Sequence, residues 1–290
     1  MSRYEIRLEE QKKLHNFIFE NSSIAYLIDQ MAINWGKEFK KAKGILDRNY
    51  PHWRNSDDAR NAIPRLIAWL KEEVETPIDV DAYKKSTLVL VEIGKLALDP
   101  LIAALKDEHW AVRFGAANVL GMIKDPRSLE PLIYALARET ESSGVMIKIC
   151  EALTNIDSDW GNNKAARIIV PDLISAINDE ANWRFRGEVM NTLGEIGDPR
   201  AIEPLIAVIK EENLDDIERG FAVSNLVKIA KLDVQPLITA LMHEDEHIRD
   251  VLAEEVKEYG YQDFGRNPKE WWQEWWEKNK ERKENTRNDR

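Results

Sequence analysis

Six Leu-Ile pairs recur along the chain at nearly constant spacing, and this spacing constrains the fold more than any other feature. Successive pairs lie 35, 31, 41, 32 and 32 residues apart: Leu66-Ile67, Leu101-Ile102, Leu132-Ile133, Leu173-Ile174, Leu205-Ile206 and Leu237-Ile238. A period of this length is typical of stacked supersecondary units, because each unit cannot bury its apolar face alone. Such an array favours a binding surface over a catalytic pocket.

Each repeat is predicted to contain two helices. The Leu-Ile pair begins the apolar stripe of helix A, since another aliphatic residue follows four positions after the leucine. Helix B is predicted from leucines followed three positions later by isoleucine: Leu90 and Ile93, Leu120 and Ile123, Leu153 and Ile156, Leu193 and Ile196, Leu226 and Ile229. No strand pattern occurs, so each unit is a helical hairpin.

Glycine and proline mark the expected ends of these helices. Gly94, Gly121, Gly194 and Gly197 are predicted to be left-handed C-caps of the B helices. The Asp-Pro-Arg triplets at 125–127 and 198–200 are expected to form the turn into the next helix, because proline disfavours helical backbone in the residue before it.

Segments 99–133 and 185–206 share a longer pattern, and through it the chain resembles a known family. The pattern is Pro-Leu-Ile, an aspartate six residues after the leucine, Val-Arg at the start of helix B, and Ala-x-x-Leu-Gly-x-Ile. It is similar to the HEAT repeat, in its phycobilisome-lyase HEAT-like form, over roughly residues 58–260. The resemblance implies an all-α fold, a right-handed α-α superhelix of about six helical hairpins with capping helices at both ends.

The resemblance also implies a polar ladder that ties the turns of successive repeats together. Its members here are Asp107, Asp179, Arg113, Arg186, Arg219 and Arg249. Met146 and Tyr83 replace the arginine in two repeats, where the ladder should be interrupted. In this family such residues are structural and not catalytic.

Three regions are expected: an N-terminal helical cap at residues 1–57, the repeats at 58–262, and a Trp-rich capping helix with a charged tail at 263–290. Trp271, Trp272, Trp275 and Trp276 share one helical face, which fits a cap or an aromatic ligand site. The long gap between repeats three and four holds an insert at 157–163, which is expected to protrude from the edge as slack or as a contact feature.

Three motifs suggest chemistry, and none is expected to carry it. His243 to His247 matches HExxH, but the repeat alignment places His243 in a turn, so the two imidazoles would not share a helical face. Asp157, Asp159 and Gly161 only partly match a calcium loop. Cys150 is expected to be a small core residue. We therefore predict no catalytic residue, metal or cofactor.

Composition limits the classes of partner and the cellular compartment that are expected for this chain. The net charge of −11 argues against nucleic acid, whose phosphates need a basic stripe. The single cysteine excludes an intrachain disulfide and favours a reducing compartment. The sequence shows no signal peptide and no apolar run long enough for a membrane span, so a cytoplasmic monomer without membrane contact is expected.

The B helices of such an array are expected to line a concave groove, where a partner protein would bind. Stepping by four along them selects fifteen positions, which include Ile147, Gly187, Gly220, Ser224 and Lys228. The candidate binding positions are the other ten: Phe114, Asn118, Met122, Glu151, Asn155, Asn191, Glu195, Asp250, Glu254 and Glu258. These positions are mixed and apolar first and acidic later, which indicates a partner with a basic segment, although a solvated helix face fits as well. The leading hypothesis is a non-enzymatic protein-binding scaffold. The alternative, implied by the resemblance, is a bilin lyase-like factor that handles chromophores on phycobiliproteins. A third class, HEAT-like DNA glycosylases, would need a basic groove, and the acidic positions argue against it.

Overall fold

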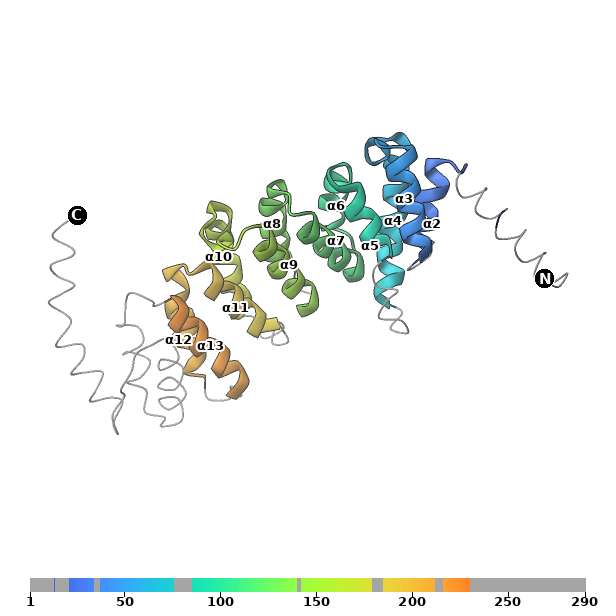
Figure 1. Cartoon of the computed structure of the whole chain (residues 1–290). Coiled ribbons are helices and arrows are strands. Elements are labelled where there is room, and N and C mark those ends of the chain that lie inside the picture. The colour runs from blue at the N-terminus through green and yellow to red at the C-terminus, as the bar shows by residue number, and fades with distance from the viewer. Residues whose placement is uncertain are drawn as a thin grey trace, which may run out of the picture. The chain divides into compact units, whose positions relative to one another are not determined.

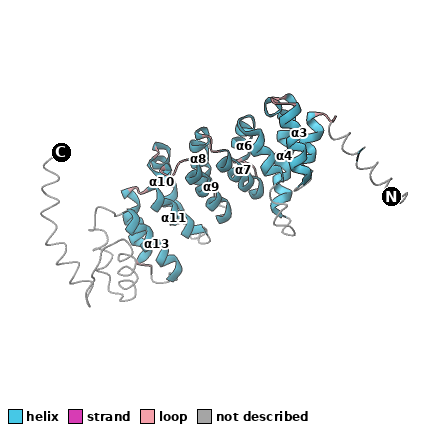
Figure 2. Cartoon of the chain, in the orientation of Figure 1, coloured by secondary structure: helices cyan, strands magenta, loops and turns pink. Residues whose placement is uncertain are grey.

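The computed structural model describes residues 13, 21–33, 37–75, 85–139, 142–178, 185–211 and 216–229 of the chain. These residues form α-helices, turns and short 3-10 segments, and they include no strand (Figure 2). The all-α class predicted from the sequence is therefore confirmed. The chain divides into two compact units, residues 1–158 and 159–290.

The first unit begins with two helices and continues with three hairpins (Figure 1). Its elements are α2 (Ile24–Ile33), α3 (Lys37–Asn49), η1 (Trp53–Asn55), α4 (Asp57–Glu75), α5 (Lys85–Ile93), η3 (Gly94–Ala97), α6 (Leu98–Ala104), α7 (Trp110–Ile123), η4 (Pro126–Ser128), α8 (Leu129–Arg138) and α9 (Ser143–Ile156). Helices α4, α6 and α8 are A helices, and α5, α7 and α9 are the B helices that follow them.

The second unit contains two described hairpins. Its elements are η5 (Trp160–Asn162), α10 (Lys164–Ile177), α11 (Arg186–Ile196), η7 (Pro199–Ala201), α12 (Ile202–Ile209) and α13 (Asp216–Ile229). Helices α10 and α12 are A helices, and α11 and α13 are B helices. The sixth predicted repeat, the HExxH segment and the Trp-rich C-terminal helix lie outside the described residues.

The recurrent leucines are the centre of each hairpin. The A-helix leucines Leu66, Leu101, Leu132, Leu173 and Leu205 are all buried. The B-helix leucines Leu90, Leu120, Leu153, Leu193 and Leu226 are buried as well. Each A helix packs on the B helix of its own hairpin, and within a unit successive B helices pack on one another, as α7 does on α9 and α11 on α13. The sequence period thus marks the packing unit.

Two of the four predicted glycine C-caps are wrong, and the structure gives the reason. Gly94 and Gly197 have φ values of 68° and 66° and do end their helices in the left-handed region. Gly121 and Gly194 instead lie inside α7 and α11, where a neighbouring B helix approaches closely. A Cβ atom on Gly121 would lie 2.7 Å from the Cα atom of Ala152 on α9. Gly121 therefore permits close helix contact, and Lys124 takes the left-handed position at the end of α7.

The Asp-Pro-Arg triplets form the predicted turns into the next A helix. Asp125 and Asp198 are N-caps of η4 and η7, and each carboxylate accepts the backbone N–H of the arginine two residues later. Proline occupies the first helical position, where a missing N–H costs nothing. These 3-10 turns fix where α8 and α12 begin.

The N-terminal helices lie against the first hairpin. Helix α2 packs on α3, α4 and α5, and Leu27, Ile28 and Met31 are buried in that contact region. Trp53 in η1 is buried too and packs with the start of the array. Helix α2 and η1 thus pack against the helices of the first hairpin.

Candidate functional site

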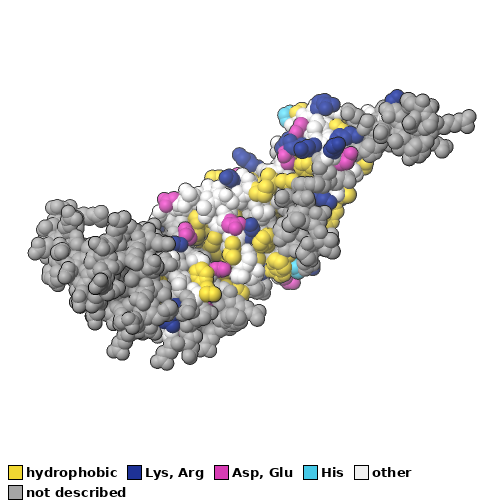
Figure 3. Space-filling model, turned by 60° about the horizontal axis from the view of Figure 1, so that its bottom comes forward, with side chains coloured by type: hydrophobic (Ala, Val, Ile, Leu, Met, Phe, Trp, Pro, Cys, Tyr) yellow, Lys and Arg dark blue, Asp and Glu magenta, His cyan; other side chains and the backbone are white. Residues whose placement is uncertain are grey.

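The predicted binding positions of the first unit form a partly apolar surface on α7 and α9, here called the B face. Trp110, Phe114, Asn118 and Met122 follow one another at intervals of four on α7, which places them on one side of the helix. Met122 is 43% exposed, and Ile147 on the neighbouring α9 is 45% exposed. In Figure 3, apolar side chains lie among single acidic and basic ones on the face toward the viewer. Exposed large apolar side chains in such a group are typical of a contact surface.

Polar residues of the B face have neighbours of their own on α9. Glu151 and Asn155 are exposed, as expected. Lys148 forms an ion pair with Glu151, and its ammonium group lies 5.3 Å from the centroid of the Phe114 ring. This lysine therefore offsets the charge of Glu151 and covers part of the aromatic ring.

In the second unit, the predicted positions on α11 are less apolar. Asn191 is half-buried, and its Oδ1 atom accepts a hydrogen bond of 2.8 Å from Nδ2 of the buried Asn225 on α13. Glu195 is exposed, and Lys228 on α13 lies 3.5 Å from its carboxylate. Both described acidic positions, Glu151 and Glu195, thus have a lysine neighbour, while Asp250, Glu254 and Glu258 lie outside the described residues.

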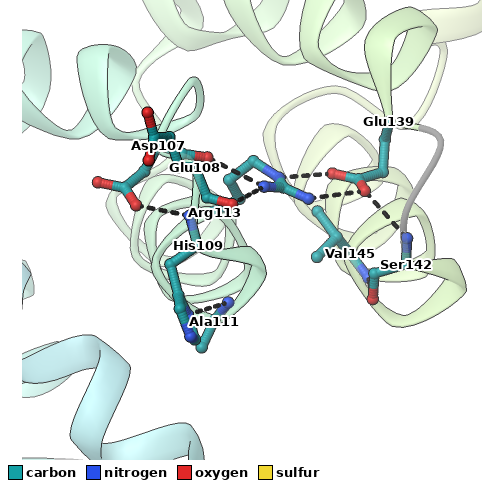
Figure 4. A network of polar contacts seen from close by, with 8 residues as sticks. All are labelled: Asp107, Glu108, His109, Ala111, Arg113, Glu139, Ser142 and Val145. Atoms are coloured by element: carbon teal, nitrogen blue, oxygen red, sulfur yellow. Dashed lines mark hydrogen bonds and ion pairs between the residues drawn. The ribbon is translucent and has the colours of Figure 1, made fainter.

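Arg113 connects the turns of two successive hairpins (Figure 4). Its Nη1 atom donates to the carbonyl oxygens of Asp107 and Glu108, in the turn of its own hairpin, at 2.9 and 3.0 Å. Its Nε and Nη2 atoms donate to the carboxylate of Glu139, in the next turn, at 2.8 and 3.0 Å. Glu139 also accepts the backbone N–H of Ser142. The carboxylate of Asp107 accepts the backbone N–H of His109 at 2.8 Å.

Arg186 and Arg219 make related contacts in the second unit. Arg186 binds the carboxylate of Glu211, in the turn between α12 and α13. Arg219 donates to the carbonyl oxygen of Ile209 in the same turn region. The acceptors Glu139 and Glu211 were not singled out in the sequence, although an acid six or seven residues after the A-helix leucine was a usable signal. Asp179, Arg249 and Tyr83 lie outside the described residues, and Met146 is buried.

The hairpins, their buried leucines and the arginine contacts agree with a comparison against known families. A model of HEAT repeats matches residues 63–143, 98–169 and 135–227, which together span more than half of the chain. The chain belongs to the HEAT-repeat family. HEAT repeats therefore account for both described sets of hairpins.

Two curated proteins are similar to this chain over more than half of its length. One is named uncharacterized phycocyanin operon protein Z, from Pseudanabaena tenuis, and is 28% identical over 185 residues, or 63% of this chain and 87% of the relative. The other is named phycocyanobilin lyase subunit beta, from a Nostoc species, and is 25% identical over 163 residues, or 55% of this chain and 78% of the relative. This chain is thus similar to one protein named for a phycocyanin operon and to another named as a phycocyanobilin lyase subunit.

The insert between the third and fourth HEAT repeats differs from its prediction. It was expected to protrude at residues 157–163, but Trp160 and Gly161 are buried in η5, which packs on α10 and α11. A Cβ atom on Gly161 would lie 2.2 Å from the carbonyl oxygen of Glu195, so the turn is pressed against α11. Burial of the large indole explains why this segment folds inward. Asp157 and Asp159 remain exposed outside this buried turn.

The described part of the HEAT array bears on two of the residue types that the sequence raised as metal ligands or nucleophiles. Its residues include no group of three His, Cys, Asp or Glu side chains placed to hold a metal ion. Cys150 is half-buried on α9 and not fully buried as predicted. No helix in the described ranges is both long and apolar enough to cross a membrane.

Ion pairs shift the pKa values of several charged groups. Burial raises the pKa of Asp47, but hydrogen bonds from Lys43, Trp53 and Arg54 outweigh it and lower the value to about 2. Arg54 also binds Glu92 on α5 at 2.7 Å, so this cluster joins α3 and η1 to the first HEAT hairpin. Hydrogen bonds from the arginine two residues later likewise lower the pKa values of Asp125 and Asp198. These carboxylates are held in the charged form, which suits structural ion pairs better than general acid catalysis.

Proposed function

We propose that this HEAT-repeat chain is a non-enzymatic scaffold that binds another protein along its B helices. The observation that carries the proposal is the exposure of Met122 and Ile147 on two adjoining B helices, with the half-buried Phe114 on the same side of α7 as Met122. Apolar side chains in a contact patch supply most of its binding energy. The half-buried Asn118 lies between Phe114 and Met122 on α7, and the exposed Asn155 on α9 would form part of the polar rim.

The proposed partner has a basic segment. The chain carries a net charge of −11, which attracts basic proteins through long-range electrostatics. Glu151 and Glu195 are exposed on the B helices, although Lys148 and Lys228 offset part of their charge. Asp250, Glu254 and Glu258 extend the acidic series in the sequence. Complementary charge of this kind mainly speeds association and fixes register.

The test is affinity purification with a double substitution, Met122→Glu with Ile147→Glu. Both side chains are exposed, so the fold should survive, while two buried carboxylates at the contact would weaken partner retention at least about tenfold. Ile168→Glu is the matched control, because Ile168 is 56% exposed on the A helix α10. Equal retention by wild type and the double variant would contradict the proposal.

A second candidate is a bilin lyase-like role in handling chromophores on phycobiliproteins. It is supported by the relative named phycocyanobilin lyase subunit beta, 25% identical to this chain. Titration of the purified chain with phycocyanobilin distinguishes the two. A saturable shift of the bilin absorption band would favour chromophore handling, whereas an unchanged spectrum together with partner retention by the B face would favour the scaffold.

A further inference from the structure

A cavity of about 680 Å³ opens between the A helices α6 and α8 of the first unit. Its walls include Ile102, Leu105, Pro131, Tyr134 and Ala135. None of the B-face positions contributes to its lining. The volume is within the range of pockets that hold ligands or anchoring side chains, roughly 300–1,000 Å³. The cavity is therefore a second candidate site on the opposite helices of the same repeats.

The cavity follows from the way in which these two hairpins stack. Gly121 lets α7 and α9 approach closely, whereas no comparably close packing joins α6 to α8. Helix α6 is also short, at seven residues, so it cannot fill the space beside α8. The opening thus lies where two successive A helices are separated, beside the closely packed B helices of the same hairpins.

Arg113 and Glu139 also line the cavity. Their side chains are only 11% and 2% exposed and are joined by two hydrogen bonds. Arg113 also binds the carbonyl oxygens of Asp107 and Glu108, and Glu139 binds the N–H of Ser142. These groups already have partners, so an occupant would gain its affinity from the apolar walls and from the rim.

The rim carries an aromatic ring between charges of both signs. Glu130, Tyr134 and Arg138 are exposed at intervals of four on α8, and all three line the cavity. Lys106 and Glu108 line it from the other side. Tyrosine and arginine are the residues that most often dominate binding energy at interfaces. Lys106 and Arg138 are the basic residues of this rim, and Asp107, Glu108 and Glu130 are the acidic ones.

We propose that this cavity takes an amphipathic helix of another protein, which inserts one large apolar side chain beside Tyr134. The backbones of α6 and α8 are hydrogen-bonded within their helices, so a strand cannot be added, and two helices bordering a groove favour a third helix between them. Glu130 and Arg138 are about 12 Å apart along α8, or about two turns. The bound helix carries acidic and basic residues about two turns apart, opposite these two charges.

The probe is a stapled helical peptide of this design, with leucines at positions i, i+4 and i+7 and with lysine and glutamate at opposite ends. A scrambled peptide of equal composition is its control. In methyl NMR of the full chain, the designed peptide should shift the signals of Ile102 and Leu105. It should also bind at least about tenfold tighter than the scrambled peptide. Tyr134→Ala should weaken binding about tenfold, as expected for an interface anchor.

Charge variants and a B-face variant complete the test. Glu130→Lys and Arg138→Glu should each weaken the peptide severalfold, whereas Lys164→Glu, an exposed reversal at the start of α10, should not. Met122→Glu should leave peptide binding unchanged, which separates this site from the B face. Absence of Ile102 and Leu105 shifts at about 1 mM peptide would overturn the proposal, as would binding that Met122→Glu abolishes and Tyr134→Ala does not.

Discussion

The contact of α7 with α9 and that of α11 with α13 share two features, a glycine contact and an arginine–glutamate pair, but the side chains around them differ. In both, the glycine after a buried leucine faces the next B helix, and an arginine near the start of the helix reaches an acid in the next turn. Gly121 meets Ala152, and the Arg113–Glu139 pair is buried. Gly194 meets the buried Asn225, and the Glu211 partner of Arg186 is 44% exposed. The repeat pattern thus specifies where helices touch, while the neighbouring side chain decides how much each contact contributes.

The largest expected difference in stability is between the Arg113–Glu139 and Arg186–Glu211 ion pairs. Arg113→Met leaves the Glu139 carboxylate, only 2% exposed, without its charged partner, and should lower the free energy of unfolding by about 3–5 kcal/mol. Arg186→Met should cost about 1 kcal/mol or less, because water reaches Glu211. Urea unfolding followed by circular dichroism measures both. If the two variants lose equal stability, burial of the pair is not what distinguishes the two contacts.

The contacts of Gly121 and Gly194 should differ in whether a second substitution restores the stability that a glycine-to-alanine change removes. Gly121→Ala should cost about 1–3 kcal/mol, because its Cβ would lie 2.7 Å from the Cα atom of Ala152. Ala152→Gly should not restore stability, since that Cα atom remains. Gly194→Ala meets the side chain of Asn225 at Oδ1 and Cγ, so Asn225→Ala should recover part of the loss. Double-mutant cycles measure this coupling, and rescue at the Gly121 contact alone would contradict the assignment.

A smaller loss of stability is expected at the hydrogen-bonded side-chain amides of Asn191 and Asn225 in the second unit. Asn191→Ala removes the acceptor of the hydrogen bond from Asn225, which still donates to the carbonyl oxygen of Phe221. The expected loss is about 1 kcal/mol, the usual net contribution of one hydrogen bond. Thermal unfolding with Asn118→Ala, the equivalent position on α7, provides the comparison. A larger loss from Asn118→Ala would show that the amide pair contributes little.

The smallest expected effect is an acid dependence shared by both units. Because Asp125 and Asp198 have lowered pKa values, the unfolded chain binds more protons than the folded one at acidic pH. Their stabilising contribution is present above about pH 4, the ordinary pKa of aspartate, and is lost as the pH falls through the lower folded values. Asp125→Asn and Asp198→Asn should each flatten the dependence of stability on pH below about pH 4. An unchanged acid profile would exclude these caps as its source.

The sequence predicted the hairpins because their signals are local. Leucine and isoleucine spacing depends only on helix geometry, and the Asp-Pro-Arg turns depend only on the backbone of neighbouring residues. The roles of Gly121 and Gly194 were mistaken because a C-cap and a close contact both require a missing side chain, and the approaching helix is remote in sequence. The sequence also does not indicate the inward turn at Trp160, because the helix on which η5 packs, α11, is remote in sequence.

The candidate site was only partly accessible from the sequence. Stepping by four along a helix places Phe114, Asn118 and Met122 on one side of α7, and α7 is helical over all three positions. Lysine neighbours of Glu151 and Glu195, at positions 148 and 228, depend on side-chain reach within and between helices, which a stepping rule does not include. The cavity beside Tyr134 could not be foreseen, because it arises from the separation of two A helices.

Photo-crosslinking from single positions tests the proposed binding surface most directly. A photoreactive phenylalanine analogue is placed at Met122, Ile147 or Ile168, three exposed apolar positions, the last of them on an A helix. We expect adducts of the same discrete mass from positions 122 and 147 and none from position 168. Adducts from position 168 alone, or from all three positions equally, would contradict binding of a partner along the B helices.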